Sequence, residues 1–260
     1  MLERDGHTVT IARDGQEALE IIRGADFDLV LLDVHMPRMS GLDVLERLRE
    51  SGNEVRAIIL TGDEAPDVVI GAAEAQAVRY LSKPIRPDTL SAQVSAALAS
   101  KPSSRPIRVV SAKRDWVELV VPCSLDAVER VRSFLIQLDA DLPEAQRDAI
   151  GQAFHELLSN AIEWGAGADP TRDVRIAYLR TRRMVLYRIA DPGPGFRLDE
   201  LTHAAAGTAT PEKLEHVRVR EEKGLRPGGF GLLLARALVD ELIYNQAQNE
   251  VVFVKYLEDP

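Results

Sequence analysis

The chain has 260 residues, a formal net charge of −9 and a pI near 5.2. This excess of acid argues against a nucleic-acid partner, because non-specific binding to phosphate needs clustered positive charge. The single cysteine, Cys123, excludes an internal disulfide and fits a reducing compartment. No apolar run reaches membrane-spanning length, so we expect a cytoplasmic protein without a membrane partner, and the length suggests two domains.

The first hundred residues alternate strand-like and helix-like patterns. Apolar or β-rich runs predict strands at 8–12, 28–33, 55–61 and 77–81, and amphipathic spacing predicts helices at 14–23, 41–51 and 87–99. The second of these strands is almost continuously apolar, as expected of a strand covered on both faces. The alternation predicts an α/β fold with a parallel sheet wound by helices.

Three chemically distinct side chains stand at the ends of predicted strands. Asp33 ends LVLLD, Thr61 ends IILT, and Lys83 follows the next strand in YLSKP. Ligands of open α/β sheets bind at the carboxyl ends of the strands. A phosphoryl group on Asp33 would be neutralised by Lys83 and hydrogen-bonded by Thr61. Each residue alone could simply cap a strand, but three in register favour a site.

These residues resemble the receiver domain of response regulators over residues 1–99. The resemblance implies a flavodoxin-like fold, Asp33 as phosphoacceptor and Mg²⁺ ligand together with the His35 carbonyl, and an upstream histidine kinase as partner. It also implies a group of receiver switch residues: Thr61, Tyr80 and Lys83. The family's first strand, which ends in an acidic Mg²⁺-binding pair, has no counterpart here. We therefore expect a receiver incomplete at its N-terminus, through an upstream start or degeneration, and poor phosphorylation of Asp33.

The pattern changes after a polar linker at 100–114. Strands are predicted at 117–122, 173–180, 184–190 and 251–257, and helices at 124–139, 143–164 and 230–242. The two central strands form a predicted hairpin, and the helices are segregated from a mostly antiparallel sheet. This order predicts a second domain, 115–260, built as a two-layer α+β sandwich.

The first motif of this domain is HELLSNAIEWG, residues 155–165. Glu156 and Asn160 are four residues apart and so share one face of a helix. The amide oxygen of Asn160 is a suitable hard ligand for Mg²⁺, and Glu156 could accept a proton from an attacking hydroxyl. Taken alone, the pair is equally typical of a solvated helix surface.

Two glycine-containing motifs follow. In ADPGPGF, Asp191 ends a strand and could accept a hydrogen bond from an exocyclic amine, while Gly193 and Gly195 let the backbone approach a flat base. In RPGGFGLLLARAL, glycines open a helix whose N-terminal amides favour phosphate. The candidate phosphate-binding residues of this motif are Arg226, Gly228, Gly229 and Gly231. Each motif alone also fits an ordinary turn or helix cap.

The order and spacing of the three motifs resemble the GHKL superfamily of ATPases, with its Bergerat ATP-binding fold, and more narrowly its serine kinases that act as anti-sigma factors. The resemblance covers residues 115–257 and implies ATP and Mg²⁺ as cofactors. It implies that Glu156 is the catalytic base, Asn160 binds Mg²⁺ and Asp191 binds adenine. It further implies a lid over the nucleotide between the second and third motifs, and a homodimer.

The leading functional hypothesis is a two-component-regulated protein serine/threonine kinase of the partner-switching type. Its substrate would be an anti-sigma factor antagonist of the STAS class, and a sigma factor is a further candidate partner. Two alternatives stay open: a module that binds ATP and partners without phosphorylation, and a relative of histidine kinases. The second alternative requires a helical hairpin with a phosphorylatable histidine, and residues 101–122 are too short and too β-like to form one.

Overall fold

The computed structural model describes most of the chain, in two compact units. The described residues are 1–62, 70–72, 75–99, 105–113, 115–195 and 231–257. One unit consists of Met1–Ile107 and Ser133–Ala140, and the other of Arg108–Arg132 and Asp141–Pro260. Within the described residues, no helix is long and apolar enough to cross a membrane.

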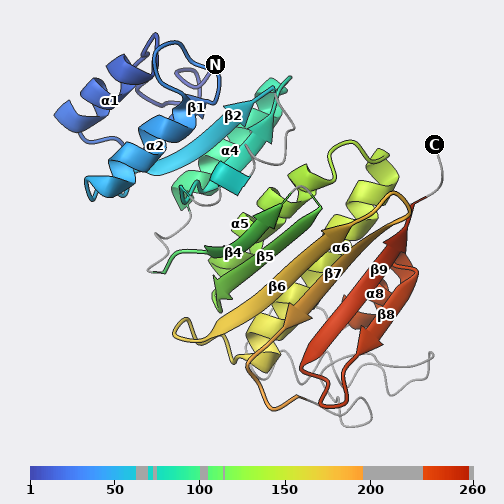
Figure 1. The fold of residues 1–260 in the computed structure, drawn as a ribbon. Coiled ribbons are helices and arrows are strands. Elements are labelled where there is room, and N and C mark those ends of the chain that lie inside the picture. Colours follow the sequence, from blue (N-terminus) through green and yellow to red (C-terminus); the bar gives the residue numbers. More distant parts are fainter. Residues whose placement is uncertain (63–69, 73–74, 100–104, 114, 196–230, 258–260) are drawn as a thin grey trace. The chain divides into compact units, whose positions relative to one another are not determined.

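The first unit has a parallel three-stranded sheet with helices packed around it (Figure 1). The strands lie in the order β1 (Leu29–Asp33), β2 (Arg56–Thr61) and β3 (Arg79–Ser82). The helices are α1 (Gly15–Gly24), α2 (Gly41–Glu50) and α4 (Pro87–Ala99). These elements match the predicted strands and helices to within two residues at each end.

The central strand β2 is almost entirely apolar because both of its faces are buried. Ala57, Ile58 and Ile59 are fully buried, although successive strand residues point to opposite faces. Ile58 packs against Val94 and Ala97 of α4. Ile59 points to the opposite face, where α2 contacts the sheet. Both faces are therefore covered, as a parallel sheet requires.

The strand predicted at 8–12 is wrong. These residues have no regular structure, and Val9 and Ile11 are 39% and 80% exposed. A strand exists only where a neighbour supplies hydrogen bonds, and none of the described strands pairs with this segment. Its β-rich composition therefore does not produce a strand.

The second unit has a six-stranded antiparallel sheet. Its strand order is β4-β5-β6-β7-β9-β8. The strands are β4 (Arg108–Lys113), β5 (Trp116–Pro122), β6 (Asp173–Arg180), β7 (Met184–Ala190), β8 (Glu241–Tyr244) and β9 (Glu250–Tyr256). The helices are α6 (Glu144–Asn160) with its π-helical continuation η1 (Ala161–Gly165), α8 (Gly231–Leu238), and the part of α5 (Leu125–Leu138) that precedes Ser133.

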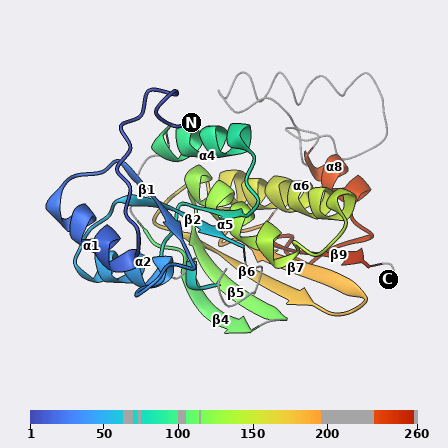
Figure 2. The same cartoon turned by 90° about the horizontal axis from the view of Figure 1, so that it is seen from above.

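The helices of this unit lie on one face of its sheet, which makes two layers (Figure 2). An aromatic cluster forms part of the core between the layers. Tyr187 of β7 contacts Phe154 of α6 at a ring distance of 5.3 Å, Tyr178 at 5.0 Å and Phe253 at 4.9 Å. All four rings are buried. The two-layer α+β sandwich predicted from the sequence is confirmed.

Two short strands were not predicted. The first, β4, lies inside residues expected to be a linker, and it pairs with β5 through an irregular register between Val109 and Ser111. The second, β8, occupies the end of the helix predicted at 230–242, which stops at Leu238. All four residues of β8 pair with β9, so tertiary pairing outweighs the helical pattern.

We expect Phe253→Ala to lower the free energy of unfolding of the second unit by about 3–5 kcal/mol, because it removes a fully buried ring from the aromatic cluster. Both tryptophans, Trp116 and Trp164, lie in this unit, so tryptophan fluorescence during urea unfolding reports on it selectively. Ile243→Ala, at a side chain that is 52% exposed, is the control. Equal midpoints for the two variants would contradict the assignment of the core.

Candidate functional site

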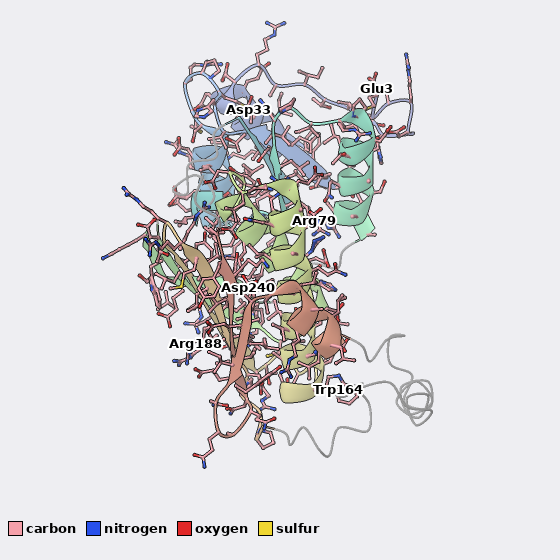
Figure 3. All side chains as sticks on the ribbon, turned by 90° about the vertical axis from the view of Figure 1, so that its right-hand side faces the viewer. Glu3, Asp33, Arg79, Trp164, Arg188 and Asp240 are labelled. Carbon is pink, nitrogen blue, oxygen red and sulfur yellow. The ribbon has the colours of Figure 1, made fainter. Side chains whose placement is uncertain are left out.

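Helix α6 ends in a π-helical turn that begins directly after Asn160. The turn Ala161–Gly165 is closed by a 2.9 Å bond from the Ala166 N–H to the Ala161 carbonyl. Such turns are rare and concentrate at functional sites. Figure 3 shows Trp164 at this end of the helix. At the end of this turn, Gly165 meets the segment that follows β7.

Gly165 and Asp191 are in close contact. A Cβ added at Gly165 would overlap the Asp191 carboxyl group, and one added at Gly193 would overlap both that group and the Gly165 carbonyl. Glycine is therefore required sterically at both positions. The structure thus brings the end of the first motif onto the second motif, far apart in the sequence.

The Asp191 turn is fixed by hydrogen bonds to its backbone. The Gly193 N–H donates to Asp191 Oδ1 at 2.8 Å, and the Asp191 N–H donates to the Asn249 carbonyl at 2.9 Å. The Asn249 side-chain amide donates to the Gly193 carbonyl at 3.0 Å. Gly195 has a φ of 85° and leaves no room for a Cβ against the Ala247 carbonyl. The turn before β9 therefore holds this loop.

The Asp191 carboxyl group is half-buried, and its electrostatics are set by opposing effects. Desolvation raises its pKa above the ordinary value, and this effect outweighs the Gly193 N–H and the Arg172 charge, which both lower it. One oxygen accepts the Gly193 N–H. A carboxylate in such a place is a strong, oriented acceptor.

The third motif meets the first at Glu156. Helices α6 and α8 pack together, and a Cβ added at Gly231 would overlap the Glu156 carboxyl group. Asn160 lies one helical turn beyond Glu156. The other residues predicted for the third motif, and the predicted lid, lie outside the described residues: Arg226, Gly228, Gly229 and 197–225.

The continuous helix from Glu156 to Gly165 sets the distance between the two contacts. Nine residues of helix span roughly 13 Å, so the Glu156–Gly231 and Gly165–Asp191 contacts lie at opposite ends of one elongated region. Asn160 lies between them along the helix. The arrangement suits an extended ligand with a different chemical group at each end.

The first unit brings its three predicted strand-end residues together as well. Lys83 forms an ion pair with Asp33, and the Lys83 N–H donates to the Thr61 carbonyl at 2.6 Å. Both side chains of the ion pair are partly exposed, whereas Thr61 and Tyr80 are buried. The His35 N–H donates to Asp33 Oδ1 at 3.1 Å. The site therefore presents one accessible carboxylate beside one cation.

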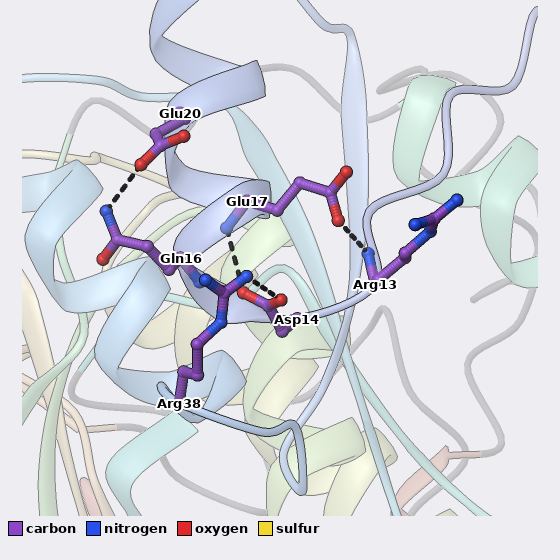
Figure 4. A network of polar contacts seen from close by, with 6 residues as sticks. All are labelled: Arg13, Asp14, Gln16, Glu17, Glu20 and Arg38. Atoms are coloured by element: carbon purple, nitrogen blue, oxygen red, sulfur yellow. Dashed lines mark hydrogen bonds and ion pairs between the residues drawn. The ribbon is translucent and has the colours of Figure 1, made fainter.

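The loop that follows Asp33 is tied to the start of α1. Asp14 caps α1 and forms an ion pair with Arg38, whose backbone has a φ of 66° (Figure 4). The Arg38 guanidinium hydrogen-bonds Asp14 and lowers the pKa of this carboxyl group. A Cβ added at Gly15 would overlap the Met39 carbonyl. These contacts fix the loop that carries His35.

The Mg²⁺ site expected at Asp33 lacks partners among the described residues. They contain no group of three or more His, Cys, Asp and Glu side chains able to hold a metal ion. Asp33 contacts the Lys83 ammonium, and the Asp14 carboxylate is engaged by Arg38 of the loop that follows Asp33. This set does not fit a divalent cation, which requires several oxygen ligands.

Three residues at the second-unit site were missed by the sequence reasoning. Gly165 could have been found, because it is the glycine that ends the helical motif. Arg172 and Asn249 carry no local signal. Both reach the Asp191 turn only through contacts between segments distant in the sequence.

Comparison with protein families identifies both units. A family model described as "Response regulator receiver domain" matches residues 1–95, and one described as "Histidine kinase-like ATPase domain" matches residues 121–255. The fold class predicted from the sequence, a flavodoxin-like receiver followed by a GHKL-like domain, is thereby confirmed.

Curated relatives match the chain over about a hundred residues. The uncharacterized transcriptional regulatory protein YkoG of Bacillus subtilis is 42% identical over 98 residues, and the response regulator MprA of Mycobacterium ulcerans is 38% identical over 97. Each match covers 37% of this chain and 42% of the relative. The chain thus spans less than half the length of these relatives.

Solved structures give matches of similar extent. The Francisella response regulator 1452 receiver domain is 30% identical, with a TM-score of 0.36, over 37% of this chain and 79% of that one. A CheY-like receiver domain protein from Methanospirillum hungatei has the same identity and TM-score, over 37% of this chain and 78% of that one.

We expect Asp191→Asn to stabilise the second unit near neutral pH. Because burial raises the pKa of Asp191, its favourable contribution is complete below the ordinary value of 3.8 and is lost as pH rises through the folded-state pKa. Asparagine cannot ionise and avoids that loss. Urea midpoints followed by tryptophan fluorescence should rise at neutral pH, and the gain should shrink toward the ordinary carboxyl pKa.

Asp148→Asn, at an exposed position of α6, is the matched control for the loss of a charge. A lower midpoint for Asp191→Asn than for wild type at neutral pH would contradict the sign of this pKa shift.

Proposed function

Because this chain belongs to the histidine kinase-like ATPase family and carries a response regulator receiver domain, we propose that it is a protein serine/threonine kinase under two-component control. The substrate is a serine of an anti-sigma factor antagonist of the STAS type, and a sigma factor is a second binding partner. An upstream histidine kinase supplies phosphate to Asp33, and the receiver thereby regulates the ATPase domain.

One observation carries this proposal: the stretch of helix from Glu156 to Gly165 connects two carboxylate–glycine contacts, Glu156–Gly231 and Gly165–Asp191. Around Asp191, the absence of side chains at Gly165 and Gly193 leaves the carboxyl group bordered by backbone. This arrangement fits a flat base whose exocyclic amine donates to Asp191. At the other end, Gly231 opens α8, where backbone amides favour phosphate. The residues present therefore fit ATP.

Magnesium fits the middle of the same region. The amide oxygen of Asn160 is the hard donor that this ion prefers, and Mg²⁺ commonly takes few protein ligands because nucleotide phosphates and water complete its shell. When bound, the ion neutralises negative charge on the phosphates. No other metal ligand is assigned to the ATPase domain.

Glu156 is the base in the proposed transfer. Its carboxylate accepts the proton of the substrate serine hydroxyl while the hydroxyl oxygen attacks the γ-phosphorus. The bond from that phosphorus to the β–γ bridging oxygen breaks, and ADP leaves. Positioning and electrostatic stabilisation provide most of the rate, so the helix that fixes Glu156 relative to Asn160 is central.

We expect Glu156→Gln to separate transfer from binding. The variant should bind MgADP, measured by calorimetry, with nearly wild-type affinity, because the base does not hold the nucleotide. Phosphate transfer from labelled ATP to a STAS-type antagonist should fall by about 10²–10⁴-fold, the usual contribution of a general base. Glu144→Gln, at an exposed position of the same helix, is the control.

Two results would redirect the proposal. Absence of MgADP binding by the wild type would refute an ATP site. Tight binding without transfer by the wild type would support the alternative of an ATP-dependent binding module.

We expect Asp33 to be the residue labelled by small-molecule phosphodonors, and only slowly, because the described residues around it do not form a Mg²⁺ site. Asp33→Asn should abolish acid-stable, base-labile labelling, whereas Asp26→Asn, at an exposed position before β1, should keep it. Rapid stoichiometric labelling of the wild type would show that the site is more complete than this set suggests.

A further inference from the structure

Arg172 links the two segments that meet at Asp191. It lies between η1 and β6, and its guanidinium donates to the Ala166 carbonyl at 3.4 Å through Nη1 and to the Pro192 carbonyl through Nη2. Ala166 directly follows Gly165, and Pro192 directly follows Asp191. A single side chain therefore connects the backbones on both sides of the Gly165–Asp191 contact.

The planar guanidinium suits this position. Its donors point in fixed directions, so two carbonyls can be held at a defined separation by one rigid group. Arg172 is itself half-buried, and its backbone carbonyl accepts the Cys123 N–H at 3.0 Å, which anchors it to the end of β5. Asn249 holds the next carbonyl of the same turn, that of Gly193. The Asp191 turn is thus held from two sides.

Arg172 is also the cation whose charge acts on Asp191. Burial raises the pKa of Asp191, and the Arg172 charge opposes that rise. Asp169 and Asp173 are close to Arg172 in sequence. The charges of these three residues and of Asp191 all act on the pKa of the buried Cys123 thiol. Among these groups, Arg172 alone favours ionisation of Asp191.

We propose that Arg172 is the positioning residue that makes the nucleotide site selective for 6-amino purines over 6-oxo purines. This inference rests on the proposed ATP site and deepens it. An ionised, fixed Asp191 only accepts hydrogen bonds, so it pairs with the exocyclic amine of adenine and repels the carbonyl oxygen of hypoxanthine. A protonated Asp191 can donate to that oxygen, and a displaced Asp191 no longer faces it, so in either case the discrimination is lost.

The experiment compares binding of MgADP and MgIDP, the inosine analogue, to the full chain by calorimetry at neutral pH. Arg172→Met removes the charge and both hydrogen bonds at nearly constant length, and Arg172→Lys keeps the charge without the double link. Arg175→Met, at an exposed position of β6, is the matched control. Far-UV circular dichroism verifies that each variant is folded.

For Arg172→Met we expect the affinity for MgADP to fall by about tenfold or more, as when a group that orients a ligand-binding residue is removed. The affinity for MgIDP should change much less, so the ADP-to-IDP ratio collapses. Arg172→Lys should be intermediate and Arg175→Met should behave as wild type. If Arg172→Met fails to fold, the ADP-to-IDP affinity ratio of Arg172→Lys tests the inference instead, and an unchanged ratio contradicts it.

Three outcomes would overturn the inference. An unchanged ADP-to-IDP ratio with retained affinity would show that Arg172 does not act on the base. An equal loss for both nucleotides would indicate a structural role only. No MgADP binding by wild type would instead refute the proposed function itself, and the inference with it.

Discussion

The close approach of the Gly165 backbone to the Asp191 carboxyl group is the constraint on which the second-unit site depends. It requires glycine at 165 and 193, because a side chain at either position would occupy the space of the carboxylate. Gly165 is the last residue of the π-helical turn that continues α6, so the end of this helix forms one side of the contact. The contact partly desolvates Asp191, which strengthens its electrostatic interactions with any ligand that reaches it.

The remaining geometry follows from this contact through rigid elements. Because α6 and η1 form one continuous helix, fixing Gly165 against β7 also fixes Asn160 and Glu156 relative to the sheet. The aromatic cluster around Tyr187 holds α6 on the strands that carry Asp191 and Asn249. Core packing and site geometry therefore use the same helix, so that a substitution in the core can displace the site.

Most elements could be predicted because their signals are local. The apolar run of β2 and the helical periodicity of α1 and α2 predict these elements. The four-residue spacing of Glu156 and Asn160 predicts that they share a helix face. The predictions were wrong or incomplete where pairing between strands determines whether a segment forms a strand. Residues 8–12 have the composition of a strand but no neighbour among the described strands, while β4 and β8 are strands mainly because β5 and β9 lie beside them. Arg172 and Asn249 were missed for the same reason, since each acts on a turn far away in sequence.

Two aspartates at strand ends, one in each unit, show how surroundings assign different chemistry to the same side chain. Asp33 is partly exposed and paired with the Lys83 ammonium, so a phosphoryl group on Asp33, the proposed phosphoacceptor, would have a neighbouring cation. Asp191 is half-buried, bonded to the Gly193 N–H and bordered by glycines, so backbone rather than side chains lies beside its carboxyl group. The Arg172 charge lowers the pKa of Asp191, and the same guanidinium donates to the Ala166 and Pro192 carbonyls on either side of the Gly165–Asp191 contact. Lys83 is therefore paired with Asp33 directly, whereas Arg172 also holds the backbone that carries Asp191, so the two cations act on their carboxylates in different ways.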